Sequence, residues 1–201
     1  TEYGTVYSLK ELEALSEVCH NAEIPLYIDG ARLGYGLAAD GNDVTLKDIA
    51  RLSDVFYIGG TKIGALFGEA VVVTNPAVLQ HFTPLVKQHG AMLAKGRLLG
   101  VQFEALLEDG LYERISRETV RLAMRLKDAF KAKGFVPFID SPTNQQFLRL
   151  PNDLIDRLHA VATFDYWGPR GKEESIVRFV TSWETREEDV EALLAAVETK
   201  K

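Results

Sequence analysis

Apolar residues recur along the chain with helical spacing in some segments and in short continuous runs in others. In the first segment they follow helical spacing, at Leu9, Leu12, Leu15, Val18 and Cys19. Ser8 precedes this run, and Glu11 stands three residues after Ser8, which is a capping-box arrangement. The pattern therefore predicts an amphipathic helix that begins directly after Ser8.

Two short apolar runs, IPLYIDG and DVFYIGG, predict strands, and the segment NDVTLKDIARLS between them predicts a capped helix. A strand, a helix and a second strand at this spacing indicate a right-handed crossover between parallel strands. The run EAVVVT, residues 69–74, predicts a further strand after a tight connection. Together these elements predict an α/β domain with a parallel sheet.

After residue 75 the pattern of apolar residues changes twice, first to a helical pattern and then to alternating strands and helices. Residues 76–134 are helical in pattern, with breaks near HGAMLAKG and at Asp109 and Gly110. After them, TNQQFLRL, TFDYWG and SIVRFVTSW predict strands, PNDLIDRLHAV predicts a capped helix, and TREEDVEALLAAVETKK predicts a closing helix with Thr185 as its N-cap and Glu188 three residues later. We therefore expect part of a large α/β domain in residues 1–85, connecting helices in 86–133 and a small α+β C-terminal domain in 134–201.

Composition and charge indicate which classes of binding partner are not expected. The 201 residues carry 23 Lys and Arg against 29 Asp and Glu, a formal net charge of −6, without the basic patch of a nucleic-acid-binding protein. No apolar run approaches the roughly 18 residues that a membrane span needs. We therefore expect neither a nucleic acid nor a membrane as a partner.

The number and positions of the cysteine and histidine residues bear on metal binding and on the cellular compartment. Cys19 is the one cysteine, which excludes an internal disulfide and fits a reducing compartment, so we expect a cytoplasmic protein. The four histidines are scattered without metal-ligand spacing, and no metal site is expected. The first residues, TEYGTVYS, resemble neither a signal nor a transit peptide and contain no initiator methionine, which leads us to expect that the chain begins in mid-protein.

Charged residues follow two of the predicted parallel strands at their carboxyl ends. Asp29 ends the first strand, Arg32 lies one tight turn further on, and Lys62 follows the second strand after Gly59, Gly60 and Thr61. Because ligands gather at this edge of an open parallel sheet, we expect the carboxylate and the amine to share a site. A lysine, a carboxylate and an arginine are what a pyridoxal phosphate enzyme requires here.

Simpler readings of these residues stay open at this point. A lysine after a strand is commonly a solvated loop residue, and an Asp-Gly pair is commonly just a turn. A phosphate-binding loop is a weaker alternative, since GGTKIG lacks the Gly-Lys-Ser/Thr order and does not open an obvious helix. Spacing alone does not decide among these readings.

Three segments, TEYGTVYSLKELEALSEVC, LYIDGARLGYGLAA and SDVFYIGGTKIGALFGEAVVV, resemble the threonine aldolase and β-eliminating lyase family. These are pyridoxal phosphate enzymes of the aspartate aminotransferase fold, fold type I. The resemblance is close from Thr1 to about Gly100 and looser through VRFVTSWET. It implies that residues 1–85 are the C-terminal part of the large cofactor-binding domain.

The resemblance also implies roles for five residues. The aspartate of the DGAR motif, Asp29, pairs with the pyridine nitrogen, and Arg32 of the same motif belongs to the cofactor site and helps to bind the substrate carboxylate. Lys62 of the GGTK motif is the Schiff-base lysine, with Thr61 near the cofactor phosphate. The arginine of an R-x-V-T strand, Arg178, grips the substrate carboxylate. Lys62 and Asp29 are the catalytic residues of this set.

The function implied is that of a low-specificity threonine aldolase, a carbon–carbon lyase that cleaves a small β-hydroxy amino acid to glycine and an aldehyde. The family's glycine-rich phosphate loop and its ring-stacking histidine are not found in the chain, so we expect an N-terminally truncated portion that forms a homodimer or homotetramer or associates with the missing portion. Two alternatives stay open. One is another pyridoxal phosphate enzyme, a β-eliminating lyase, aminotransferase or racemase, and the other is a non-catalytic structural fragment.

Overall fold

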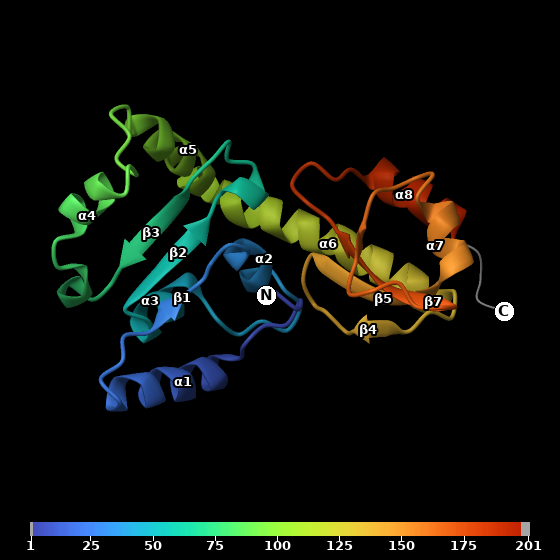
Figure 1. Cartoon of the computed structure of the whole chain (residues 1–201), viewed down its shortest axis with the longest axis horizontal. Helices are drawn as coiled ribbons and strands as arrows, with labels where there is room; N and C mark the ends of the chain where they lie inside the picture. Colours follow the sequence, from blue (N-terminus) through green and yellow to red (C-terminus); the bar gives the residue numbers. More distant parts are fainter. Residues whose placement is uncertain (1, 198–201) are drawn as a thin grey trace. The chain divides into compact units, whose positions relative to one another are not determined.

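The computed structural model describes residues 2–197, and the chain divides into two compact units (Figure 1). The three-stranded unit comprises Tyr7–Leu37 and Asn42–Arg114. The four-stranded unit comprises Thr1–Val6, Ala38–Gly41 and Ile115–Lys201. The domain boundaries predicted at residues 85 and 133 stay predictions.

The three-stranded unit contains the helices, strands and 3₁₀ turns of the first half of the chain. In order these are α1 (Leu9–Asn21), β1 (Tyr27–Ile28), α2 (Leu33–Leu37), α3 (Leu46–Leu52), β2 (Val55–Gly59), η1 (Thr61–Ile63), β3 (Glu69–Val73), η2 (Pro76–Leu79), α4 (Phe82–Gln88), α5 (Arg97–Leu107), η3 (Glu108–Gly110) and the start of α6 (Leu111–Ala132). The predicted helical breaks are confirmed, because α4 and α5 are separated at HGAMLAKG and Asp109 and Gly110 have positive φ angles.

The sheet of this unit has the order β1-β2-β3. Strands β1 and β2 are parallel, with Tyr27 level with Val55, as the predicted crossover requires. Strand β3 runs antiparallel to β2, with Gly59 level with Glu69, and the opposed arrows are visible in Figure 1. The connection from Gly60 to Gly68 is too short for a parallel crossover, which explains the reversal.

Both predicted N-terminal helices begin where their capping boxes place them. The Ser8 hydroxyl accepts from the Glu11 N–H and Glu11 reaches back to the Ser8 N–H, and Thr45 and Asp48 form the same pair at α3. The predicted buried face of α1 is only partly correct. Leu12 and Ser16 are buried, whereas Val18 is 66% exposed.

The four-stranded unit contains α6 from Ile115 onward and the elements that follow it. These are β4 (Pro137–Ile139), β5 (Gln145–Pro151), α7 (Asn152–Leu158), β6 (Asp165–Tyr166), β7 (Glu174–Val180) and α8 (Glu187–Ala196). The sheet has the order β4-β5-β7-β6, and every neighbouring pair is antiparallel. The predicted strands β5, β6 and β7 are confirmed, and the short edge strand β4 adds to them.

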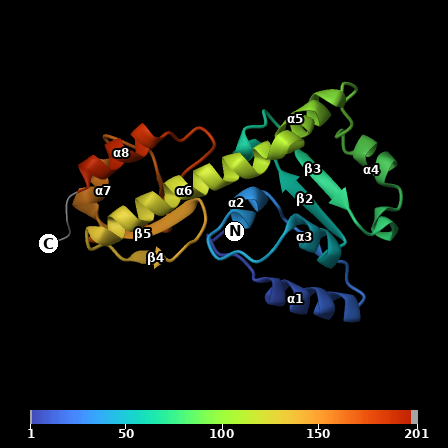
Figure 2. The ribbon, with the colours of Figure 1, turned by 180° about the vertical axis from the view of Figure 1, so that it is seen from behind.

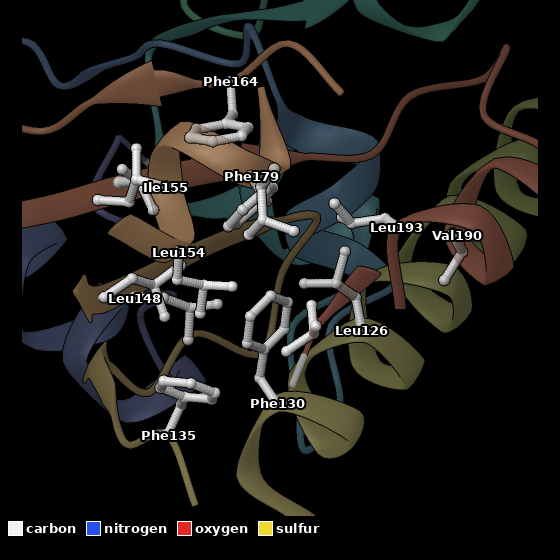
Figure 3. Close-up of a cluster of buried hydrophobic side chains, with 14 of the residues drawn as sticks. Leu126, Phe130, Phe135, Leu148, Leu154, Ile155, Phe164, Phe179, Val190 and Leu193 are labelled. Atoms are coloured by element: carbon white, nitrogen blue, oxygen red, sulfur yellow. The ribbon is translucent and has the colours of Figure 1, made fainter. Parts of the chain in front are cut away.

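One face of this sheet carries the hydrophobic core of the unit. Leu148 of β5 and Phe179 of β7 pack with residues of α6, α7 and α8, among them Leu126, Leu154 and Leu193 (Figure 3). Figure 2 shows the second half of α6 along β5. On the opposite face the ring of Trp167 makes edge contacts with Phe147 and Tyr3. Helices on one side and aromatic rings on the other explain why β5 is buried along nearly its whole length.

Two helix starts differ from the prediction. The predicted N-cap Thr185 is wrong, because α8 begins at Glu187 and Asp189 accepts from the backbone N–H of Arg186 at 3.0 Å. The Thr185 hydroxyl instead accepts from Ser182 N–H in the preceding turn. Helix α7 begins after Pro151 without a side-chain cap. The predicted end of the closing helix, residues 198–201, lies outside the described residues.

Candidate functional site

Asp29 directly follows β1, and its carboxylate is held by two donors. Ile28 is level with Phe56 in the parallel pair, so Asp29 stands beside Tyr57 of β2. The Tyr57 hydroxyl and the Ala31 N–H, the latter at 3.0 Å, both donate to Oδ1 of Asp29. Within the described residues no donor is recorded on Oδ2. The carboxylate thus has one occupied oxygen and one that is open to a ligand.

Hydrogen bonding keeps this carboxylate ionised. The Tyr57 hydroxyl lowers the pKa of Asp29 most, the Ala31 N–H adds to the effect, and the positive charge of Lys62 adds a smaller part. Burial and the neighbouring Asp29 in turn raise the pKa of Tyr57, which remains a hydrogen-bond donor. The influence of Lys62 on Asp29 means that the two predicted catalytic residues lie within electrostatic reach of each other.

Lys62 lies in the 3₁₀ turn η1, which directly follows β2. Ile63 in the same turn is fully buried and anchors it, and the carbonyl oxygen of Lys62 accepts a hydrogen bond from Tyr35 of α2. The Lys62 side chain is half-buried. The backbone of the turn is therefore fixed, and the half-buried Lys62 side chain starts from the carboxyl end of β2.

Glu69, the first residue of β3, holds the start of the same turn. Its carboxylate accepts from the Gly60 N–H at 2.7 Å and from the Thr61 hydroxyl at 3.3 Å. The antiparallel pairing of Gly59 with Glu69 brings this carboxylate to the turn. Thr61 is exposed, and its hydroxyl faces a carboxylate in this structure.

The backbones behind Asp29 and Lys62 approach each other very closely. A Cβ atom added at Gly30 would lie 1.6 Å from the carbonyl oxygen of Tyr57, so only glycine fits. The Gly59 N–H donates to the Gly30 oxygen at 3.0 Å. The buried hydroxyl of Tyr112 accepts from the Gly34 N–H and donates to the Gly59 oxygen. These contacts hold the loop after β1 and the loop after β2 rigidly together.

The two predicted arginines fall in different units. Arg32 is half-buried just before α2 in the three-stranded unit. Arg178 is on β7 of the four-stranded unit, where its guanidinium contacts Asp165 at 2.6 Å, Gln145 at 3.1 Å and the ring of Trp167 at 5.2 Å. Arg178 is therefore held in place by a carboxylate and an aromatic ring.

Sequence reasoning missed Tyr57 and Glu69. The signal for Tyr57 was present, because a tyrosine at this place on the strand next to Asp29 faces the same edge once the register is known. No local signal marked Glu69, since its role depends on β3 being antiparallel.

Among residues 2–197 no group of three or more His, Cys, Asp or Glu side chains is placed to hold a metal ion. Within the same residues no helix has the length and apolar character to cross a membrane.

The geometry defines the chemistry that the three-stranded unit can perform. A lysine amine can bond covalently to a carbonyl carbon, and an ionised carboxylate with one open oxygen can hold a protonated ring nitrogen. A cofactor with an aldehyde and a basic ring nitrogen therefore fits the residues present.

Comparison with known proteins gives a consistent result. Residues 1–152 match the family model described as β-eliminating lyase. The chain is 30% identical over 200 residues to a low specificity L-threonine aldolase of Pseudomonas sp. (strain NCIMB 10558), with 98% of this chain and 56% of that protein covered. It is 31% identical over 196 residues to the enzyme of the same name from Pseudomonas aeruginosa, with 96% and 55% covered.

A solved structure is also similar. The threonine aldolase of Leishmania major superposes with a TM-score of 0.91 at 39% identity, covering 94% of this chain and 55% of that one. The chain thus spans about half the length of the relatives that it matches.

Proposed function

The chain belongs to the β-eliminating lyase family, and on this basis we propose that it acts, as part of a complete enzyme, as a pyridoxal-phosphate-dependent threonine aldolase. Its fold is that of the fold type I pyridoxal phosphate enzymes, as predicted. The reaction proposed is cleavage of a small β-hydroxy amino acid to glycine and an aldehyde. The observation that carries the proposal is that half-buried Lys62 lies within electrostatic reach of Asp29, whose pKa is lowered and whose two donors both lie on Oδ1.

Pyridoxal phosphate, when bound, supplies a conjugated ring that accepts electrons from the bond to be broken. Asp29 would hold the proton on the ring nitrogen through Oδ2, because Oδ1 is already occupied by Tyr57 and Ala31. Lys62 would hold the cofactor covalently and, once the substrate amine has replaced it, would move a proton at its own Nζ. Glu69 and Tyr35 keep the backbone of this turn in place.

Arg178 and Arg32 are the proposed holders of the substrate carboxylate. A guanidinium binds a carboxylate through two parallel hydrogen bonds, which a lysine cannot do. The contacts of Arg178 with Asp165 and Trp167 orient its plane, and a substrate carboxylate would compete with Asp165 for it. Thr61 is proposed to lie near the cofactor phosphate, which would require its hydroxyl to turn away from Glu69.

We further propose that the enzyme is cytoplasmic and oligomeric, or that this chain associates with the N-terminal part of such an enzyme. The single cysteine fits a reducing compartment. Two observations support association. Within the described residues β1 pairs with β2 alone, which leaves one edge of β1 without a partner strand, and Leu66 and Val71 near the site are 85% and 54% exposed.

Covalent trapping tests the assignment of Lys62. Borohydride reduction in the presence of pyridoxal phosphate, followed by peptide mapping, should label Lys62. Lys62→Ala should abolish both the label and the visible absorbance of the bound cofactor. Lys87→Ala and Lys95→Ala are matched controls and should keep both. A label on Lys87 or Lys95 would overturn the assignment, and the absence of any specific label would favour a non-catalytic fragment.

Product analysis with L-threonine separates the lyase classes. An aldolase releases glycine and acetaldehyde, whereas a β-eliminating enzyme releases ammonia and 2-oxobutanoate. An aminotransferase requires an oxo acid as acceptor, and a racemase leaves the carbon skeleton intact. The complete enzyme should form glycine and acetaldehyde in equal amounts, and the other products would contradict the proposal.

A further inference from the structure

Gln145 is a fully buried polar residue whose side chain contacts Arg178. Its exposed fraction is 0%, although its amide carries donors and an acceptor that need partners once they are removed from water. Nη1 of Arg178 donates to Oε1 of Gln145 at 3.1 Å. Nε2 of Gln145 donates to the backbone carbonyl oxygen of Glu2 at 3.3 Å. The bond to Glu2 fixes which end of the amide faces Arg178.

The register of the sheet places Gln145 on the same face as Arg178. Phe147 of β5 is level with Arg178 of β7, and Asp165 of β6 is level with Arg178 on the other side. Gln145 stands two residues before Phe147 and shares its face, because side chains two residues apart on a strand point the same way. Gln145 and Asp165 therefore reach Arg178 from the two strands that flank β7.

Gln145 and Asp165 hold different nitrogens of the guanidinium. Asp165 accepts from Nη2 at 2.6 Å and Gln145 accepts from Nη1, whereas Nε is buried and has no recorded partner among the described residues. A carboxylate that binds Arg178 therefore has to bond to Nη1 and Nη2. The positions of these two nitrogens decide whether two parallel hydrogen bonds can form.

The two acceptors respond differently to an incoming carboxylate. Asp165 is negatively charged and its side chain is 62% exposed, so it repels a carboxylate and can turn into the solvent. Gln145 is neutral and buried, so it can stay bonded to Nη1. We propose that Gln145 is a positioning residue for the substrate carboxylate, because it holds Arg178 in the orientation that the carboxylate requires. This inference rests on the function proposed above, in which Arg178 binds that carboxylate.

The segment that begins at Glu2 holds the amide of Gln145 in place. Residues 1–6 belong to the four-stranded unit. Gly4 is buried with a φ of 69°, and a Cβ atom added there would lie 2.4 Å from Oγ of Ser141. The segment thus packs closely against the chain just before β5, where only glycine fits. This packing keeps the Glu2 carbonyl within reach of Gln145.

The first experiment tests the positioning of Arg178 without substrate or turnover. NMR measures the rate of rotation about the Cζ–Nη1 bond of Arg178 in the 201-residue chain. Gln145→Met keeps the size of the side chain and removes the amide. It should speed this rotation at least roughly tenfold, since it removes a hydrogen bond to a charged group. An unchanged rate in the folded variant would overturn the proposal.

Gln146→Met is the matched control. Gln146 is the next residue, is 1% exposed and donates to the Thr143 oxygen at 2.8 Å, but it is level with Phe179 on the opposite face of the sheet. Its substitution should leave the rotation rate of Arg178 as it is. Equal acceleration in both variants would indicate a general loosening of the unit and would contradict a specific role of Gln145.

Steady-state kinetics of the complete enzyme with L-threonine test whether this order serves substrate binding. Gln145→Met should raise KM at least roughly tenfold with a smaller change in kcat, whereas Gln146→Met should change neither. Gln145→Glu is a second variant in case Gln145→Met does not fold. It keeps an acceptor for Nη1, so the rotation should stay slow, but its charge repels the substrate carboxylate and KM should still rise.

The two experiments can fail separately. The rotation rate decides whether Gln145 positions Arg178, and the formation of glycine by the unchanged enzyme decides whether the proposed function is correct. An unchanged KM in an active, folded Gln145→Met enzyme would overturn the role of Gln145 in substrate binding.

A substitution away from Gln145 tests the link to Glu2. Gly4→Ala crowds Ser141 and should displace Glu2, which should raise KM at least roughly threefold through loss of a hydrogen bond between neutral groups. Gly41→Ala is the matched control, because Gly41 has a similar φ of 75° but nothing lies within 4 Å of an added Cβ atom. An equal rise in both variants would show that backbone strain alone is responsible and would overturn the link.

Discussion

The hydroxyl group of Tyr57 donates a hydrogen bond to Oδ1 of Asp29. The Ala31 N–H donates to the same oxygen, so both recorded donors lie on one side of the carboxylate. This relationship decides two properties at once. It keeps Asp29 ionised, and it leaves Oδ2 as the oxygen that can receive a ring-nitrogen proton.

Removal of the Tyr57 hydroxyl should raise the pKa of Asp29. Tyr57→Phe deletes the largest of the contributions that lower this pKa and leaves the ring in place. An NMR titration of the Asp29 carboxyl group measures the change. Tyr27→Phe is the matched control. The Tyr27 ring lies 6.2 Å from the Tyr57 ring, but within the described residues the Tyr27 hydroxyl donates no hydrogen bond to Asp29. Identical titration curves in the two variants would refute the role of Tyr57.

Loss of the Asp29 charge should slow the complete enzyme without unfolding it. An amide in place of the carboxylate cannot hold the ring-nitrogen proton, so Asp29→Asn should lower kcat by roughly 10² to 10⁴-fold and weaken cofactor binding. Turnover and cofactor absorbance are measured together with circular dichroism. Asp40→Asn, at an exposed carboxylate, should change none of these. Near-normal turnover of Asp29→Asn would place the ring-nitrogen partner elsewhere.

Substitution of Arg178 should affect substrate binding more than the chemical step. Arg178→Lys replaces a guanidinium, which can donate two parallel hydrogen bonds, by an ammonium group, which acts as a point charge. The variant should raise KM roughly tenfold with a smaller change in kcat. Steady-state kinetics of the complete enzyme measures both constants. Asp165→Asn removes the competing carboxylate and should not raise KM. A parallel rise in both variants would indicate that the ion pair only supports the fold.

Asp54 should make the stability of the three-stranded unit depend on pH. Asp54 is 5% exposed, and its carboxylate accepts from Asn75, from Leu26 N–H and from His20. The Asn75 amide lowers the pKa of Asp54 most, followed by Leu26. A lowered folded-state pKa stabilises the fold above the unfolded value of about 3.9, and this contribution is lost as the pH falls through the folded value.

Urea unfolding at several pH values measures this effect. Asp54→Asn should destabilise the chain by about 1–3 kcal/mol near neutral pH, because a buried donor loses its acceptor. The difference from the unchanged chain should begin to shrink below the unfolded-state pKa of about 3.9, because the unfolded chain then binds a proton that Asp54 in the folded chain does not yet bind. A difference that stays constant down to about pH 3 would show that the charge of Asp54 does not matter.

Local signals predicted the elements whose causes are themselves local. The capping boxes at Ser8 and Thr45 each satisfy backbone groups within three residues, so they could be read without knowledge of the fold. The same reasoning failed at Thr185, because α8 begins only at Glu187 and the Thr185 hydroxyl accepts from Ser182 N–H in the preceding turn. Which residue precedes the first turn of a helix depends on the path of the chain.

The sequence by itself determined that Asp29 and Lys62 follow two strands of one crossover, and the handedness and parallel pairing of such a unit bring strand ends to one edge. The tertiary structure alone decided what surrounds them. Tyr57 reaches Asp29 through the register of β1 with β2, and Glu69 reaches Gly60 because β3 turns back antiparallel. Gln145 likewise reaches Arg178 through the register of β5 with β7. Hydrogen bonds between residues far apart in sequence are fixed by packing and register, which no local pattern encodes.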